Sequence, residues 1–130
     1  MIRNTETLGI LMMAFTLALS SCGVPRTPSG VIEEYLDAMV DKNVSRAVNL
    51  SCSTWEENAK TDGAGFRGVE VSLEDALCSV IDESAESATV SCSGKFVFQY
   101  AGGEIRELNL DRPNYSLVQE SGVWKMCGHE

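Results

Sequence analysis

The spacing of the apolar residues changes once along this chain, and the change separates a helical part from a sheet. Between residues 31 and 40, apolar side chains recur every three or four positions, as on one face of a helix. From residue 77 onward they alternate with polar residues, as in strands that have one buried face. The sequence therefore predicts the α+β class, in which N-terminal helices pack on a curved antiparallel meander sheet.

The helical part is expected to hold one long helix and two short ones. Thr27 followed by Pro28 is typical of a helix start, because a capping residue precedes a proline at the first helical position. A second short helix is expected over 45–52. A third turn, which holds Trp55, is expected to lead into a glycine-rich loop over 60–68.

The register of the strands should keep one face of the sheet apolar, because a slip of one residue turns every side chain over. A loop of three residues that ends at Glu104 meets this condition, whereas a loop of two residues sets Phe98 opposite Glu107. The turn over 111–114 is expected to return the next strand beside the preceding one. The expected pairs are Phe98 with Leu108, Phe96 with Leu110, Leu110 with Tyr115, Leu108 with Leu117, Leu117 with Trp124, and Tyr115 with Met126.

The segment 72–81 fits both a helix and a strand. Its apolar residues fall on one helical stripe, but we favour a strand over 77–83. A hairpin centred on Ala85 then places Cys78 opposite Cys92, and such antiparallel pairs approach closely enough for a disulfide.

The N-terminal segment carries the features of an export signal. Residues 8–19 form an uncharged apolar run of 12, whereas a transmembrane helix needs about 20 residues. The next residues, 19–22 (LSSC), resemble a bacterial lipobox, in which the cysteine is lipidated and becomes the new N-terminus. The alternative is ordinary secretion with cleavage near Ser20 or Ser21.

These features predict the domain organisation. We expect a lipoprotein signal peptide over 1–21, a lipidated Cys22, a short tether over 22–28 and one folded domain over 29–130. The protein would then lie at the cell envelope, on the extracytoplasmic face of a bacterial membrane, held by its lipid anchor.

The remaining cysteines fit an oxidising compartment, because their number is even once Cys22 is set aside. Pairing Cys78 with Cys92 leaves Cys52 with Cys127, although alternation places Cys127 on the face opposite Trp124. Four cysteines allow three connectivities, so the sequence alone does not select one. There is no CxxC pair, and we expect two disulfides rather than a metal site.

The charge balance excludes some functions. The chain has 130 residues, a formal net charge of −9 and one histidine. An acidic protein is a poor ligand for nucleic acid, whose phosphates require clustered Lys and Arg. One histidine argues against a histidine-rich metal site, and His129 is expected to be a solvated residue of the tail. We expect no metal and no cofactor.

Two segments resemble the nuclear transport factor 2-like, or cystatin-like, superfamily. Residues 27–39 (TPSGVIEEYLDAM), with the break and short helix after them, are similar to its opening helices. Residues 117–127 (LVQESGVWKMC) are similar to the last hairpin of its small bacterial lipoproteins, many of which are domains of unknown function. The resemblance implies a curved sheet wrapped over helices into a cone that can hold a pocket.

The resemblance also bears on activity, because the superfamily includes steroid isomerases, dehydratases and polyketide cyclases. Tyr35 falls at the helix position where a steroid isomerase carries its oxyanion-hole tyrosine. An oxyanion donor needs a partner base in the same pocket. The acidic residues of the predicted sheet, Asp82, Glu107 and Asp111, do not point inward, so we predict no catalytic residue.

The leading hypothesis is therefore a non-catalytic, membrane-anchored domain, monomeric or homodimeric, that binds a small ligand or a partner protein. The alternative is a cone-pocket enzyme that uses Tyr35 as a hydrogen-bond donor. The candidate pocket residues are the aromatic side chains expected on the inner face: Tyr35, Trp55, Phe96, Phe98, Tyr115 and Trp124.

Overall fold

The structure, a computed structural model of the chain, describes residues 26–130. The predicted signal peptide over 1–21, the lipidated Cys22 and most of the tether lie outside the described residues. In the described part, no helix is long and apolar enough to cross a membrane.

The described chain begins with three helices, α1 (Pro28–Val40), α2 (Val44–Asn49) and α3 (Glu56–Ala64). The predicted start of α1 is confirmed, because the Thr27 side chain accepts a hydrogen bond of 3.1 Å from the Gly30 amide. The predicted loop over 60–68 is wrong in its first half, since α3 continues to Ala64.

Packing explains why glycine does not end α3 early. Gly63 is buried against α2, and a Cβ atom there would lie 2.7 Å from Val44 Cγ2. A glycine inside a helix costs about 1 kcal/mol relative to alanine. Here it allows two helices to approach closely, so tertiary contact compensates for its poor propensity.

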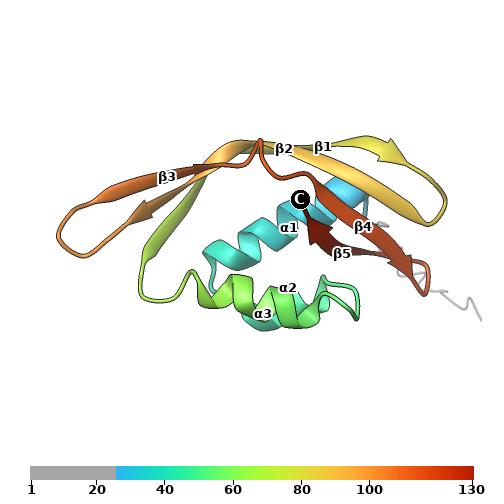
Figure 1. The fold of residues 1–130 in the computed structure, drawn as a ribbon, viewed down its shortest axis with the longest axis horizontal. Helices are drawn as coiled ribbons and strands as arrows, with labels where there is room; N and C mark the ends of the chain where they lie inside the picture. Colours follow the sequence, from blue (N-terminus) through green and yellow to red (C-terminus); the bar gives the residue numbers. More distant parts are fainter. Residues whose placement is uncertain (1–25) are drawn as a thin grey trace, which may run out of the picture.

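Five strands follow: β1 (Glu70–Glu83), β2 (Ser87–Gln99), β3 (Ile105–Asn109), β4 (Tyr115–Glu120) and β5 (Val123–His129). They form one antiparallel sheet with the order β1-β2-β4-β5, and β3 also pairs with β2. The sheet arches over α1, and α2 and α3 lie on the far side of α1 (Figure 1). The predicted α+β class, with helices first and a curved antiparallel sheet after them, is confirmed.

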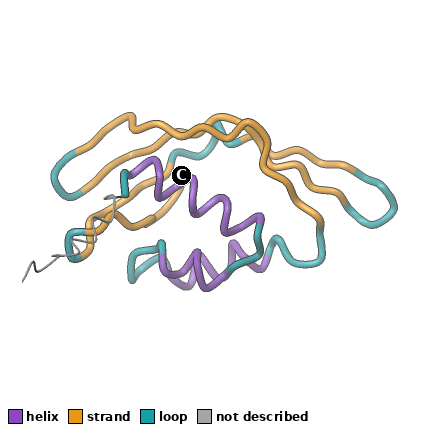
Figure 2. The backbone as a smooth tube through the Cα atoms, turned by 180° about the vertical axis from the view of Figure 1, so that it is seen from behind, coloured by secondary structure: helices purple, strands orange, loops and turns teal. Residues whose placement is uncertain are grey.

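The ambiguous segment 72–81 is a strand within β1. Cys78 lies opposite Cys92 in the β1–β2 register, and the two form the predicted disulfide. The register shifts between Glu74 and Leu77, at a bulge that faces Gly94. Gly94 has φ 101°, and a Cβ atom there would lie 2.6 Å from the Glu74 carbonyl oxygen. This bulge lets the long hairpin bend over the helices (Figure 2).

The expected pairing of β3 with β4 is wrong. β2 is long enough to hold two partners end to end along one edge: residues 87–90 pair with β4, and residues 95–99 pair with β3. The turn over 111–114 therefore carries the chain onward along β2, from beside Lys95 to beside Val90, instead of reversing it onto β3. β3 and β4 diverge at this turn, which opens the sheet beside α1.

Both predicted hairpin registers are wrong, by two residues at Phe96 and Leu117 and by three at Tyr115, which pairs with His129 instead of Met126. Phe96 pairs with Leu108, because the Tyr100 amide donates to the Glu104 carbonyl and closes the three-residue loop one position earlier, over 101–103. Leu117 pairs with Met126, because Ser121 and Gly122 form a two-residue turn with positive φ angles of 53° and 77°. A slip of two preserves alternation, so the apolar residues keep their predicted face.

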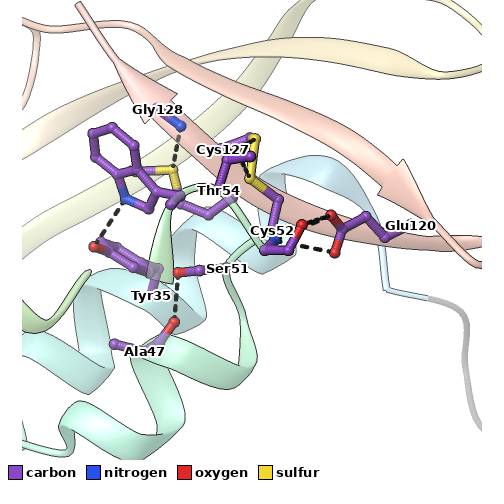
Figure 3. The surroundings of a disulfide bond; sticks show 11 residues. Tyr35, Ala47, Ser51, Cys52, Thr54, Glu120, Cys127 and Gly128 are labelled. Carbon is purple, nitrogen blue, oxygen red and sulfur yellow. Dashed lines mark hydrogen bonds between the residues drawn. A yellow bond between two sulfur atoms is a disulfide. The ribbon is translucent and has the colours of Figure 1, made fainter. Parts of the chain in front are cut away.

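The second predicted disulfide, Cys52–Cys127, is also confirmed. The backbone after α2 lies beside β5, where the Cys52 amide donates to the Met126 carbonyl and the Met126 amide donates to the Leu50 carbonyl, each at 2.8 Å. A register shift in the β4–β5 ladder near Cys127 adds one residue to β5. This bulge brings Cys127 to the edge at which Cys52 lies (Figure 3).

Candidate functional site

A cavity of about 370 Å³ lies among α1, the end of α3 and the inner face of the sheet. It opens where β3 and β4 diverge, and Leu108 and Pro113 lie at that point. Its walls are mostly apolar: Leu36 and Met39 come from α1, and Phe96 comes from β2. A volume of 300–1,000 Å³ is typical of small-molecule sites.

One end of the cavity is polar, and Asp62 is its centre. The Tyr35 hydroxyl donates a hydrogen bond of 2.8 Å to Asp62 Oδ2. His129 Nε2 lies 3.6 Å from the same oxygen. The side chains of Asp62 and His129 are 29% and 37% exposed, so both remain within reach of a molecule in the cavity.

The Tyr35 hydroxyl is held from two sides. The Trp55 indole Nε1 donates to it at 3.4 Å, and its own proton goes to Asp62. Figure 3 shows Tyr35 and the hydrogen bond to its hydroxyl from the indole. Because a phenol has one proton, Tyr35 could donate to a ligand only after its bond to Asp62 breaks.

Burial and the Asp62 carboxylate affect both tyrosines of the site. Burial raises the pKa of the Tyr35 phenol well above its usual range, the Trp55 indole opposes this, and Asp62 adds to it. Burial also raises the pKa of Tyr115, and the Asp62 charge contributes there as well. Both phenols are therefore neutral hydrogen-bonding groups at ordinary pH.

The polar end of the cavity can act as a proton acceptor or as a hydrogen-bond acceptor. The Asp62 carboxylate and the His129 imidazole can accept protons or hydrogen bonds from a bound molecule, while the apolar walls exclude water. Among residues 26–130, no cluster of three or more His, Cys, Asp or Glu side chains has the arrangement of a metal site.

The structure brings together three of the six candidate pocket residues. Tyr35, Phe96 and Tyr115 line the cavity. The other three do not line it: Trp55 contacts Tyr35 and His129, Phe98 packs against Phe66, and Trp124 packs against the core near the β4–β5 turn. Their roles in binding remain predictions.

The polar residues Asp62 and His129 line the cavity but are absent from the predicted pocket residues. Asp62 was assigned to a loop, although Trp55, Ala59 and Asp62 have the spacing of one helical face. His129 is exposed, as expected for a solvated residue, but its ring also lies 5.2 Å from that of Trp55. The bulge in β5 turns it to the face of Tyr115, with which it pairs, and strict alternation could not predict this.

No family model matches this chain, and no curated protein matches it. Solved structures share its fold at low identity. A proposed dehydratase of the nuclear transport factor 2-like family from Streptomyces avermitilis is 10% identical, covers 77% of this chain and 89% of its own, and has a TM-score of 0.58.

Two further solved structures share this fold. A SEC-C motif containing protein from Rhodopseudomonas palustris is 14% identical, with 81% of this chain and 78% of its own covered and a TM-score of 0.56. A ketosteroid isomerase-like protein from Erwinia carotovora atroseptica is 16% identical, with coverages of 75% and 88% and a TM-score of 0.53. At these identities the likeness shows the fold alone, which is nuclear transport factor 2-like, or cystatin-like.

Proposed function

We propose that this cystatin-like domain is a lipid-anchored, extracytoplasmic binding domain whose cavity holds a small, mostly apolar molecule. The observation that carries the proposal is the cavity itself, which has apolar walls and a single polar end at Asp62. A pocket of this kind suits a ligand that buries an apolar body and directs one polar group toward Asp62 and His129.

The location is supported by two disulfides, which persist in oxidising compartments, and by the lipobox-like residues that end at Cys22. The test is a Cys22→Ala variant of the full chain expressed in a bacterium, with Ser21→Ala as the matched control that keeps a small residue there. The wild type and the control should partition into the detergent phase and carry acyl mass. Equal membrane association of Cys22→Ala would contradict the anchor.

Ligand binding is tested by native mass spectrometry of the full chain, extracted from membranes in a mild detergent. Leu108 lines the cavity and is 55% exposed, so Leu108→Trp should fill the opening without disturbing the core. Leu77→Trp is the matched control, because Leu77 is 67% exposed and lies on β1, outside the cavity. We expect a discrete added mass on the wild type and the control that Leu108→Trp loses. No added mass on any variant contradicts the proposal.

A second candidate is an acid–base enzyme, favoured by the position of Asp62 between Tyr35 and His129. In this case the Asp62 carboxylate would take a proton from carbon, and Tyr35 would orient Asp62. The role differs from that of an oxyanion donor, because the Tyr35 proton is already bonded to Asp62. Two of the solved structures with this fold are described as a proposed dehydratase and an isomerase-like protein.

Isotope exchange separates the two candidates. The molecule retained by the full chain is incubated with it in D₂O and then analysed by mass. An enzyme that moves a proton to and from carbon should introduce deuterium at carbon, and Asp62→Asn should abolish this while Glu57→Gln, an exposed change on the same helix, should not. A retained molecule that exchanges no carbon-bound hydrogen supports binding alone.

A further inference from the structure

We infer that the molecule held in this cavity is a small organic cation, an amine or a quaternary ammonium; the inference rests on the proposed binding function. What points to it is the combination of aromatic walls with a lone carboxylate. Phe66, Phe96 and Tyr115 line the cavity together with Tyr35 and His129. They come from separate elements, so the fold gathers their rings around one space.

Aromatic rings in a cavity wall can attract a cation. The rings of Phe66 and Phe96 are 5.1 Å apart and nearly perpendicular, at 71°. The Tyr115 and His129 rings are 6.1 Å apart. The face of an aromatic ring carries partial negative charge, and quaternary ammonium groups are recognised in proteins by several such faces.

The formal charge of the cavity is negative, which suits a positively charged ligand. Asp62 is the carboxylate that lines it, and within the described part of the chain no Lys or Arg does so. Lys60, two residues from Asp62 on α3, pairs with Glu57 at 2.6 Å and faces a separate hollow. An anionic ligand would therefore meet a carboxylate with no Lys or Arg among the described residues that line the cavity.

A neutral apolar ligand fits less well than a cation. It would displace water from Asp62 and leave the carboxylate with the Tyr35 hydroxyl and the edge of His129 as its partners. Removing water from a charged group is unfavourable unless another charge compensates it. A ligand cation beside Asp62 provides that compensation, and the neutral phenols of Tyr35 and Tyr115 do not oppose it.

The test compares three probes of one shape: choline, its neutral carbon isostere 3,3-dimethylbutan-1-ol, and the anion 3,3-dimethylbutanoate. The full chain is held in maltoside micelles, which contain no choline group, at one fixed pH. The readout is the proton resonance of the His129 ring, which is unique because the chain has one histidine. We expect choline to bind at least about tenfold more tightly than the isostere, and the anion most weakly.

Two variants identify the groups responsible. Asp62→Asn keeps the shape and an acceptor for Tyr35. It should lower the affinity for choline toward that for the isostere, while the affinity for the isostere stays unchanged. Phe66→Leu should lower the affinity for choline more than the affinity for the isostere, because it removes a ring but keeps an apolar side chain. Glu57→Gln is the control on α3 and should change neither affinity, since Glu57 lies outside the cavity.

The outcomes separate this inference from the binding proposal. Equal or tighter binding of the neutral isostere, or choline binding unaffected by Asp62→Asn, overturns the cation inference and leaves pocket binding standing. If no probe binds, the charge of the molecule retained in native mass spectrometry decides: a cation supports the inference, and a neutral or anionic molecule overturns it. No probe binding and no retained molecule sensitive to Leu108→Trp overturns both.

Discussion

The hydroxyl of Tyr35 donates a 2.8 Å hydrogen bond to the Asp62 carboxylate, and this bond joins α1 to α3 at the polar end of the cavity. The two residues are 27 positions apart in the sequence. Tyr35 is 2% exposed, so its hydroxyl has few alternative partners if Asp62 is removed. The bond therefore contributes both to the stability of the helical layer and to the position of the carboxylate in the site.

The first prediction concerns the energy of this bond. Tyr35→Phe and Asp62→Ala should each lower the free energy of unfolding by about 1–2 kcal/mol, as expected for a hydrogen bond to a charged, partly exposed group. The double variant should lose about 1 kcal/mol less than the sum, because the two changes remove the same bond. Urea unfolding measures all three. Tyr100→Phe, near the exposed β2–β3 loop, is the control. If the losses of the two single variants add up to the loss of the double variant, Tyr35 and Asp62 do not interact directly.

The second prediction is a loss of stability at alkaline pH that depends on Tyr35. Burial, with Asp62, raises the pKa of this phenol in the folded state above the value of about 10 in unfolded chains. The folded state then binds more protons than the unfolded state, so this contribution is complete below pH ~10 and declines as pH rises further.

The measurement is the free energy of unfolding across this pH range for the wild type and Tyr35→Phe. The variant should show a shallower decline, whereas lysine ionisation affects both proteins equally. Tyr115 should contribute in the same direction, since burial and Asp62 also raise its pKa. Equal slopes for the wild type and Tyr35→Phe would show that the phenol is not held neutral by its surroundings.

The third prediction ranks the two disulfides. Cys52–Cys127 closes a sequence separation of 75 residues, and Cys78–Cys92 closes one of 14. Chain entropy then predicts contributions of about 4.5 and about 3 kcal/mol, because the longer loop restricts the unfolded chain more. Replacing each pair by alanine and measuring urea unfolding should show a difference of about 1.5 kcal/mol. An equal or reversed order would contradict this account.

The fourth prediction concerns the contact between α2 and α3. A Cβ atom on Gly63 would lie 2.7 Å from Val44 Cγ2, so Gly63→Ala should destabilise the fold by about 1–3 kcal/mol despite alanine's better helix propensity. Gly65→Ala is the matched control, because its Cβ would meet the Asp62 carbonyl oxygen at 3.4 Å. Val44→Ala combined with Gly63→Ala should recover part of the loss. An unchanged free energy of unfolding for Gly63→Ala would show that α2 and α3 can move apart without cost.

Much of the fold could be predicted from local patterns. The spacing of Val31, Tyr35 and Met39 predicts α1, and the alternation after residue 77 predicts a sheet with one apolar face. The hairpin that joins Cys78 to Cys92 follows from the same alternation. These features depend on neighbours in sequence, and the slips of two residues in the later hairpins left the predicted face unchanged because alternation repeats every two residues.

The functional site could be predicted only in part, because its residues meet through contacts between distant segments. Asp62 reaches Tyr35 because residues 60–64 are helical rather than a loop, and this last turn of α3 packs on α2 where Gly63 meets Val44. His129 reaches Asp62 because one added residue in β5 reverses the alternation. Neither effect is visible in a local pattern.

The sequence by itself determined the types and order of the elements and the apolar face of the sheet, because these depend on the spacing of side chains along the backbone. The tertiary structure alone decided that β2 pairs with both β3 and β4, that the sheet opens between them, and that Tyr35, Asp62 and His129 meet there. The physical reason is that long-range pairing depends on the packing of the whole chain, and several arrangements satisfy the same local spacing.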